Sequence, residues 1–176
     1  MSIRRFEDYT YINRFTFSRS PVQIFPFNTQ IQGTVLFMIV TFCGHSQIYD
    51  KDTVRKRLTD EIHELLRTGH RKFYLGGYGD FDNLAAAVLT ELKNTCSDME
   101  RILILPYLDK QVDTSLYDGT LYPPLENVPK RLAISRRNKW MVEQSSVIVV
   151  YVDHNWGGAA KTLEHAVKKG LRIINI

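Results

Sequence analysis

The chain has 176 residues, of which 44% are hydrophobic and 24% charged, and its formal net charge is +4. These values are typical of an ordinary soluble domain, and a modest charge without a dense basic stripe disfavours a nucleic-acid binder. The two cysteines, Cys43 and Cys96, suit neither a disulfide framework nor a zinc site. We therefore expect a cytoplasmic protein without a metal or cofactor. The apolar run 34–42 is too short to cross a membrane.

Residues 1–34 differ from the rest of the chain. They are rich in Arg, Phe, Tyr and Asn and show no sustained hydrophobic period, which predicts an irregular N-terminal extension. Met38 stands at the head of the first strong strand pattern. Residues 1–37 therefore either include such an extension or precede the native start of the protein. The predicted domain covers residues 35–176.

From residue 35 onward, apolar runs of strand length alternate with segments of helical period. In chain order, the pattern predicts a strand at 35–42, a helix from a cap at Asp52 or Thr53 to Leu66, a strand at 73–75, a helix at 81–93, a strand at 102–106, a long loop at 107–128, a helix at 129–144, a strand at 147–152, a helix at 162–169 and a strand at 171–176.

This alternation predicts an α/β fold of the Rossmann-like, doubly wound type. Because the strands are continuous apolar runs, they belong to a mostly parallel, five-stranded sheet with helices on both faces. Ligands of such folds bind beyond the carboxyl ends of the strands. The segments at those ends are "CGHS", "GGYGD", a Tyr-rich loop and "WGGAAKT". We expect the functional site there.

Two common nucleotide motifs are absent. A P-loop has glycine directly before its lysine, whereas Ala160 precedes Lys161 here. The dinucleotide fingerprint G-x-G-x-x-G is missing after the first strand, where "CGHSQI" has a single glycine. A P-loop ATPase and an NAD-dependent dehydrogenase are therefore both disfavoured.

Glycine-rich turns precede two of the predicted helices. Glycine lets backbone N–H groups approach a phosphate, and a helix N-terminus adds positive potential. One such turn is often only a tight connection, but two at the same edge of a sheet favour an anion site. The residues predicted to bind ligand or phosphate are Gly44, His45, Gly76, Gly77, Gly79, Asp82, Gly157, Gly158, Lys161 and Thr162.

Several side chains near these turns have structural interpretations as well. Asp82 and Glu164 each lie near the start of a predicted helix, where an acidic residue is stabilising in itself. Arg137 either pairs with a phosphate or lies on a solvated helix face. His45 and His154 either bind ligand or only shape their loops. These alternatives stay open from the sequence alone.

Two segments carry a resemblance to a known family. "GGYGDFDNLAAAV" and "SSVIVVYVDHNWGGAAKTLEHA" resemble the two glycine-rich turns of the SLOG superfamily. That superfamily includes the Lonely-guy phosphoribohydrolases, the DNA-processing protein, and small bacterial and phage proteins of unknown role. The Lonely-guy enzymes carry Arg-Lys-x-x-Met ahead of P-G-G-x-G-T-x-x-E. The matching positions here hold Arg137, Asn138 and Met141, then Gly157, Gly158 and Glu164, while Trp156 replaces the proline and Ala160-Lys161 the Gly-Thr pair.

The resemblance implies a cytoplasmic protein that binds a nucleotide or a nucleotide-derived ligand, and it makes a homodimer an expectation. A first alternative is N-glycosidic hydrolysis of a nucleoside monophosphate, with Glu164 and Arg137 as the catalytic residues. A second alternative is DNA binding, as in the DNA-processing protein. The departures at Trp156 and at Ala160-Lys161 affect the phosphate-binding backbone, so the resemblance leaves open whether the chain is an enzyme.

Overall fold

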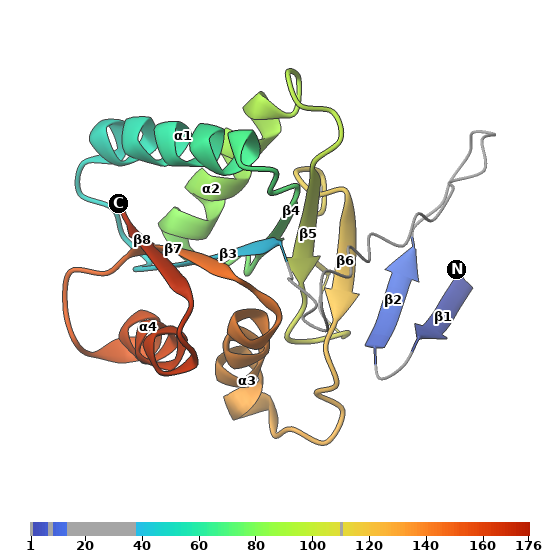
Figure 1. The fold of residues 1–176 in the computed structure, drawn as a ribbon. Coiled ribbons are helices and arrows are strands. Elements are labelled where there is room, and N and C mark those ends of the chain that lie inside the picture. The colour runs from blue at the N-terminus through green and yellow to red at the C-terminus, as the bar shows by residue number, and fades with distance from the viewer. Residues whose placement is uncertain (1, 7–8, 14–37, 110) are drawn as a thin grey trace, which may run out of the picture.

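Figure 1 shows a computed structural model of the protein, which describes residues 2–6, 9–13, 38–109 and 111–176. These residues form one sheet with the strand order β1-β2-β6-β5-β4-β3-β7-β8, together with four helices. The elements in chain order are β1 (Ser2–Phe6), β2 (Tyr9–Asn13), β3 (Ile39–Gly44), α1 (Lys51–Arg67), β4 (Lys72–Leu75), α2 (Gly79–Leu92), β5 (Glu100–Ile104), β6 (Gly119–Tyr122), α3 (Lys130–Gln144), β7 (Val147–Tyr151), α4 (Gly157–Lys169) and β8 (Arg172–Asn175).

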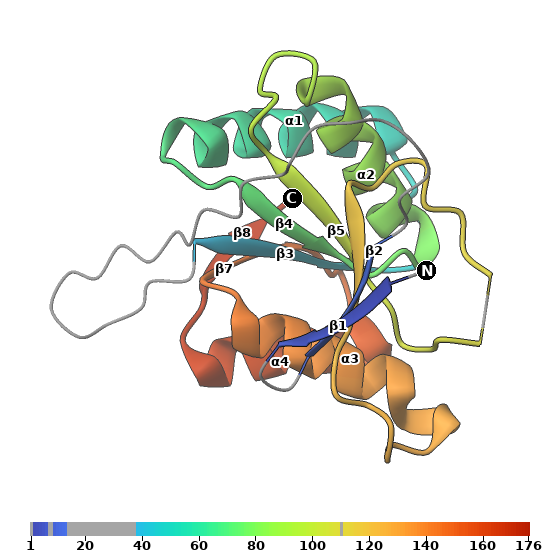
Figure 2. The same cartoon turned by 90° about the vertical axis from the view of Figure 1, so that its right-hand side faces the viewer.

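The strands from β3 to β8 are parallel, and the chain winds outward from β3 in both directions. Figures 1 and 2 show α1 and α2 on one face of the sheet and α3 and α4 on the other. The prediction of a doubly wound α/β fold is therefore confirmed. Among the described residues, no helix has the length and apolar character that a membrane span needs.

The prediction of five parallel strands is wrong, because the parallel part of the sheet has six. The additional strand is β6, which pairs with β5 inside the segment expected to be a loop. Three of its four residues, Gly119, Thr120 and Leu121, are only half-buried, so they form no continuous apolar run. Its strand conformation comes from pairing across the sheet, which a local hydrophobic pattern does not reveal.

The N-terminal segment, expected to be irregular, contains two short strands. β1 and β2 form an antiparallel pair, and β2 continues the sheet antiparallel to β6. Most of the remaining extension, residues 14–37, lies outside the described residues, and so does the first part of the strand expected at 35–42.

Three predicted helix starts need correction. The N-cap of α1 is Asp50 rather than Asp52 or Thr53, and its Oδ1 accepts a hydrogen bond of 3.1 Å from the backbone N–H of Thr53. Helix α2 begins at Gly79 rather than at residue 81. Helix α4 begins at Gly157 rather than at residue 162, so its two glycines form the first turn of the helix.

The core lies in two layers, one on each face of the sheet. In β7, Val147 and Val149 pack with the apolar faces of α1 and α2, whereas Ile148 and Val150 pack with α3 and α4. This alternation is the two-residue period of a strand buried on both faces. The sheet is therefore covered by helices on both faces. Its loops reach solvent at the two edges where the strands begin and end.

A charged cluster joins β5 to β6 away from the carboxyl ends of the strands. Nε and Nη2 of Arg101 each donate a 3.0 Å hydrogen bond to Asp118, and Nζ of Lys93 lies 2.6 Å from the same carboxylate. The Arg101 side chain is 9% exposed and that of Asp118 is 25% exposed. Burial by itself raises the pKa of Asp118, but the hydrogen bonds from Arg101 and Lys93 outweigh it and lower the pKa to about 2.

Replacing Asp118 with Asn should therefore destabilise the protein in a pH-dependent way. The folded pKa lies below its ordinary value, so the charge contributes fully above about pH 4 and is lost as the pH falls toward 2. We expect Asp118→Asn to lower the free energy of unfolding by about 2 kcal/mol at pH 7, and by about half as much near pH 3. Urea unfolding at both pH values measures this difference.

Asp98→Asn is the matched control, because Asp98 pairs with Arg71 at 2.9 Å with 66% of its own side chain exposed. An exposed ion pair contributes little to stability. Equal destabilisation by the two substitutions would contradict the role given to the Asp118 cluster.

Candidate functional site

The sheet has a topological switch point between β3 and β7. These strands are neighbours and parallel, yet β3 leads into α1 on one face and β7 leads into α4 on the other. The loops that leave them diverge, and a doubly wound fold binds its ligand in the resulting crevice. The loops are residues 45–50 and 152–156.

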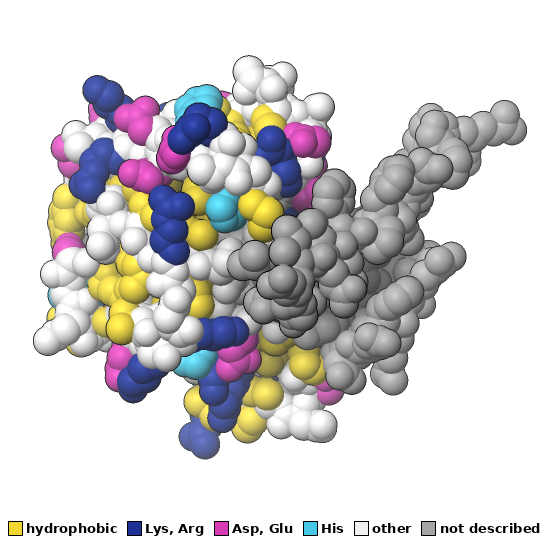
Figure 3. All heavy atoms as spheres, viewed as in Figure 1, with side chains coloured by type: hydrophobic (Ala, Val, Ile, Leu, Met, Phe, Trp, Pro, Cys, Tyr) yellow, Lys and Arg dark blue, Asp and Glu magenta, His cyan; other side chains and the backbone are white. Residues whose placement is uncertain are grey.

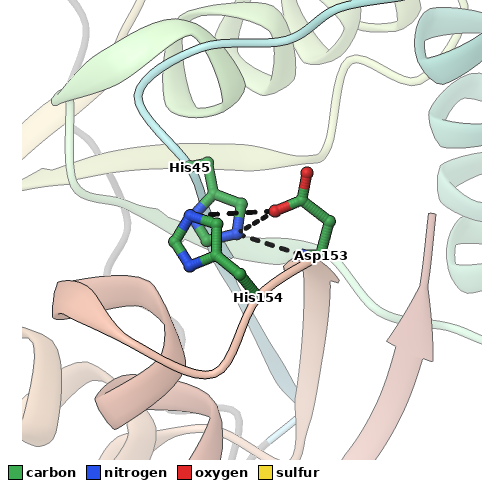
Figure 4. Close-up of side chains that lie close together, drawn as sticks. All are labelled: His45, Asp153 and His154. Atoms are coloured by element: carbon green, nitrogen blue, oxygen red, sulfur yellow. Dashed lines mark hydrogen bonds and ion pairs between the residues drawn. The ribbon is translucent and has the colours of Figure 1, made fainter.

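Three side chains from these two loops meet at the switch point (Figure 4). Nε2 of His45 lies 2.7 Å from Oδ1 of Asp153 and accepts a hydrogen bond of 3.0 Å from the backbone N–H of Asp153. Nε2 of His154 lies 3.8 Å from the same carboxylate oxygen. His45 and Asp153 are adjacent only because β3 and β7 pair, with Gly44 opposite Tyr151.

Aromatic rings continue the cluster outward. The ring of His154 stacks between those of His45 and Trp156, with centroid distances of 3.7 and 4.0 Å. Trp156 is 69% exposed. The stack therefore runs from His45, next to the end of β3, to Trp156 at the surface. The exposed indole ring is available to a planar ligand.

The N-terminus of α4 is open toward the solvent. Its N-cap, Trp156, makes no side-chain capping hydrogen bond, and the first turn has no acidic residue. Gly157 has φ = 88°, a conformation that favours glycine. Among the described residues, no atom lies within 4 Å of a Cβ placed on Gly157 or Gly158. The helix therefore presents unpaired N–H groups, and Lys161 lies one turn further on.

The N-terminus of α2 is occupied by groups of the protein itself. The backbone N–H of Tyr78 donates a 3.1 Å hydrogen bond to Asp82, and the N–H of Asp80 donates to Ser46 O at 3.0 Å. Two acidic residues stand in its first turn. Their negative charge opposes a bound phosphate. The two glycine-rich turns are thus unequal, and the one at α4 is the better anion site.

An open hollow of about 560 Å³ lies beside α4, and the two glycines of the first turn are not among its lining residues. Its walls are the loop after β7 and the outward face of α4. The lining residues are Val152, Asp153, His154, Asn155, Ala160, Lys161, Leu163 and Glu164.

Arg137 is buried and fixes the turn after β4. Its Nη1 donates to the carbonyl of Gly76 at 2.6 Å and to that of Ile104 at 3.1 Å, at the ends of β4 and β5. A Cβ on Gly76 would lie 2.5 Å from this nitrogen and 2.7 Å from Oδ2 of Asp82, so only glycine fits. Burial raises the pKa of Asp82, while the charge of Arg137 lowers it.

Two buried polar atoms beside Gly76 lack a hydrogen-bond partner within the described part of the chain. They are Oδ1 of Asp82 and Nε of Arg137. Such atoms carry a desolvation cost unless a water or a ligand group completes them.

The structure separates the residues proposed for hydrolysis. Glu164 lines the hollow, with its side chain 63% exposed and its Oε1 2.6 Å from Nζ of Lys168. Arg137 lies inside the molecule and is not among the residues that line the hollow. Thr162 is buried and accepts a 3.4 Å hydrogen bond from Asn138 of α3. Two positions later on the helix, Glu164 points to nearly the opposite side.

The remaining predicted residues lie around the same edge. Gly44 ends β3 against Phe81, whose ring would be 2.4 Å from an added Cβ, and Gly77 lies near Leu103 and Tyr117. The Cys43 thiol is buried, and its Sγ donates to Ala159 O at 3.3 Å. Burial raises its pKa to about 12, so it is no thiolate nucleophile at neutral pH.

Sequence reasoning did not select Asp153 or Trp156. Asp153 follows the β-branched run of β7 directly, and a carboxylate at the carboxyl end of a parallel strand is a usable signal. Its pairing with His45, 108 residues away, depends on the β3–β7 contact. Trp156 was noted only as a departure from a family motif.

Comparisons with known proteins agree on the fold. No family model matches the chain, and no curated protein matches it in sequence. The solved structure named TM1055 matches with a TM-score of 0.54 at 16% identity, over 77% of this chain and 71% of that one. The molybdenum cofactor carrier protein of Chlamydomonas reinhardtii matches with a TM-score of 0.53 at 16% identity, over 78% of this chain and 74% of that one.

DNA processing protein A of Streptococcus pneumoniae also matches, with a TM-score of 0.55 at 14% identity. The alignment covers 77% of this chain but only 49% of that one. At such low identity these likenesses concern the fold alone. All three structures are SLOG-type Rossmann-like proteins. The chain therefore shares the Rossmann-like fold of these three structures, which is the fold that the resemblance to the SLOG superfamily implied.

Proposed function

We infer that the protein binds a small phosphate-bearing ligand of the nucleotide class at the β3–β7 switch point. One observation carries this proposal. The uncapped N-terminus of α4 lies at the place where doubly wound folds bind ligands, and Lys161 in its second turn lines an open hollow there.

The phosphate of such a ligand would lie at the first turn of α4. The N–H groups of Gly158 and Ala159 donate to its oxygens, and Lys161 adds a charge-assisted contact. No acidic side chain in that turn competes for these donors. The net charge of +4 also favours an anion.

The planar part of the ligand would lie against the aromatic stack. One face of the Trp156 ring packs on His154 and most of its surface is exposed. Stacking of a base on an aromatic side chain contributes about 1–3 kcal/mol. One structural neighbour is named as a carrier of the molybdenum cofactor, a small molecule, which supports a binding role for this fold.

Gly158→Asp should abolish most of the binding. No described atom crowds this position and its φ is not in the left-handed region, so the variant should fold normally. Its carboxylate would place negative charge where the phosphate binds. We expect affinity for nucleoside monophosphates to fall at least about tenfold, which is about 1.4 kcal/mol. Isothermal titration with a panel of nucleoside phosphates and cyclic nucleotides measures it.

Gly158→Asn is the matched control, since it adds nearly the same shape without the charge. It should bind far more tightly than the Asp variant. Equal affinities of the two variants, or no heat from the wild type across the panel, would refute the anion site at α4.

Hydrolysis of an N-glycosidic bond is a second candidate, and the position of Glu164 on the wall of the hollow favours it. The hydrogen bond from Lys168 lowers the pKa of Glu164, so its carboxylate is ionised at neutral pH. An ionised carboxylate beside the sugar stabilises a developing oxocarbenium ion or activates water.

The hydrolytic role predicts that the wild type releases free base from AMP or a related nucleotide and that Glu164→Gln does not. Glu143→Gln is the control, because Glu143 is a partly exposed glutamate that does not line this hollow. Chromatography of the products measures base release. Ligand binding without base release in the wild type would assign the site to binding alone.

DNA binding remains the less favoured alternative. On the face seen in Figure 3, Lys and Arg side chains are scattered among Asp and Glu rather than gathered into a continuous band. Nonspecific DNA binding depends on many phosphate contacts from basic side chains.

A further inference from the structure

Three electron-pair donors converge at the switch point. The nitrogen and oxygen ligand atoms of His45, Asp153 and His154 all lie within 4.8 Å of one another. In Figure 4 both imidazole rings direct a nitrogen toward the same carboxylate oxygen. The three residues come from two loops that the β3–β7 pairing holds together.

The hydrogen bonding of His154 determines where its lone pair lies. Its Nδ1 is 3.1 Å from the carbonyl oxygen of Trp156. A carbonyl only accepts, so Nδ1 carries the hydrogen and Nε2 of the neutral ring carries the lone pair. That lone pair faces Oδ1 of Asp153 at 3.8 Å, which is too long for a hydrogen bond.

His45 offers a second nitrogen, whose single lone pair accepts a backbone N–H, so an ion would bind there in exchange for that hydrogen bond. Its Nε2 accepts the N–H of Asp153 at 3.0 Å and lies only 2.7 Å from Oδ1 of the same residue. A lone pair and a carboxylate oxygen at that separation repel each other unless a cation lies with them. Either a proton on Nε2 or a metal ion supplies such a positive charge. A metal ion would satisfy all three donors.

The surroundings of the rings match those of metal ligands. A ligating histidine almost always donates its other N–H to a carbonyl, a carboxylate or a water, and His154 does so to Trp156. The ring of His154 is held by stacking on both sides, and the His45 side chain is only 12% exposed. The rings of His45 and His154 stack with their centroids 3.7 Å apart, so ligation of one ion by both nitrogens requires the two rings to turn out of this stack.

We propose that His45, Asp153 and His154 form a binding site for a divalent transition-metal ion of the zinc class. Two imidazole nitrogens and one carboxylate suit Zn²⁺ or Co²⁺, whereas Mg²⁺ and Ca²⁺ prefer oxygen ligands. Ligand bonds of about 2.0–2.2 Å around a tetrahedral ion place the donor atoms roughly 3.3 Å apart. The 2.7 and 3.8 Å separations bracket that value.

Three protein ligands leave a fourth position for water or for an anion in the adjacent hollow. Asp153 and His154 line that hollow together with Lys161, so a bound ion would face the proposed phosphate site. The metal site does not depend on the nucleotide proposal, because the metal alone is the probe.

The test uses the full chain without an affinity tag, stripped of metal with a chelator. Titration with Zn²⁺ in a calorimeter should show one ion bound per chain. Co²⁺ should give the visible absorption of a low-symmetry site with nitrogen ligands, and Zn²⁺ should displace it. Absence of both signals would overturn the proposal and assign the contact to a protonated histidine paired with Asp153.

His154→Phe and Asp153→Asn test the ligands separately. The first keeps an aromatic ring for the stack, and the second keeps the shape of the side chain. Each should weaken Zn²⁺ binding at least about tenfold, since loss of even an outer-shell partner costs 10–100-fold. His63→Phe removes an exposed histidine of α1 and should leave binding unchanged. Wild-type affinity in either ligand variant, with unchanged melting temperature, would refute the site.

Discussion

A buried guanidinium holds the carboxyl edge of the sheet in place. Arg137 reaches from α3 to the carbonyl groups that end β4 and β5, and Asp82 of α2 supplies the nearby negative charge. A charge in the interior is tolerated only when it is paired and hydrogen-bonded, and removal of one partner of a buried pair typically costs about 3–5 kcal/mol. This contact thus joins both helical layers through the sheet and leaves room only for glycine at residue 76.

The same contact explains why the two glycine-rich turns differ. The turn at α2 closes on itself, because Asp82, which lies close to Arg137, accepts the N–H of Tyr78. The turn at α4 has no side-chain cap, and Lys161, one turn further on, lines the hollow. An anion therefore meets free helix donors at one turn and an acidic, occupied end at the other. The two turns therefore differ as candidate anion sites for an electrostatic reason.

Two residues that depart from the Lonely-guy motif have identifiable places in the structure. Trp156 occupies the position of the motif proline, and its ring extends the stack of His45 and His154 to the surface. Lys161 occupies the position of the motif threonine and brings a positive charge to the wall of the hollow. Both changes alter the side chains at the proposed ligand site, while the backbone fold stays the same. Fold likeness at 14–16% identity therefore says little about the ligand.

The sequence by itself determined the alternating α/β pattern and the doubly wound class, and it predicted a site at the carboxyl edge of the sheet. These follow from periodicity and from glycine at strand ends, which are properties of neighbouring residues. It missed β6, which is a strand only through pairing with β5, and the start of α4 at Gly157. The sequence did not decide whether the Arg137 side chain is solvated or binds a ligand. In the fold this side chain is buried. Only the tertiary structure brought His45 to Asp153, because strands β3 and β7 pair across more than a hundred residues of chain.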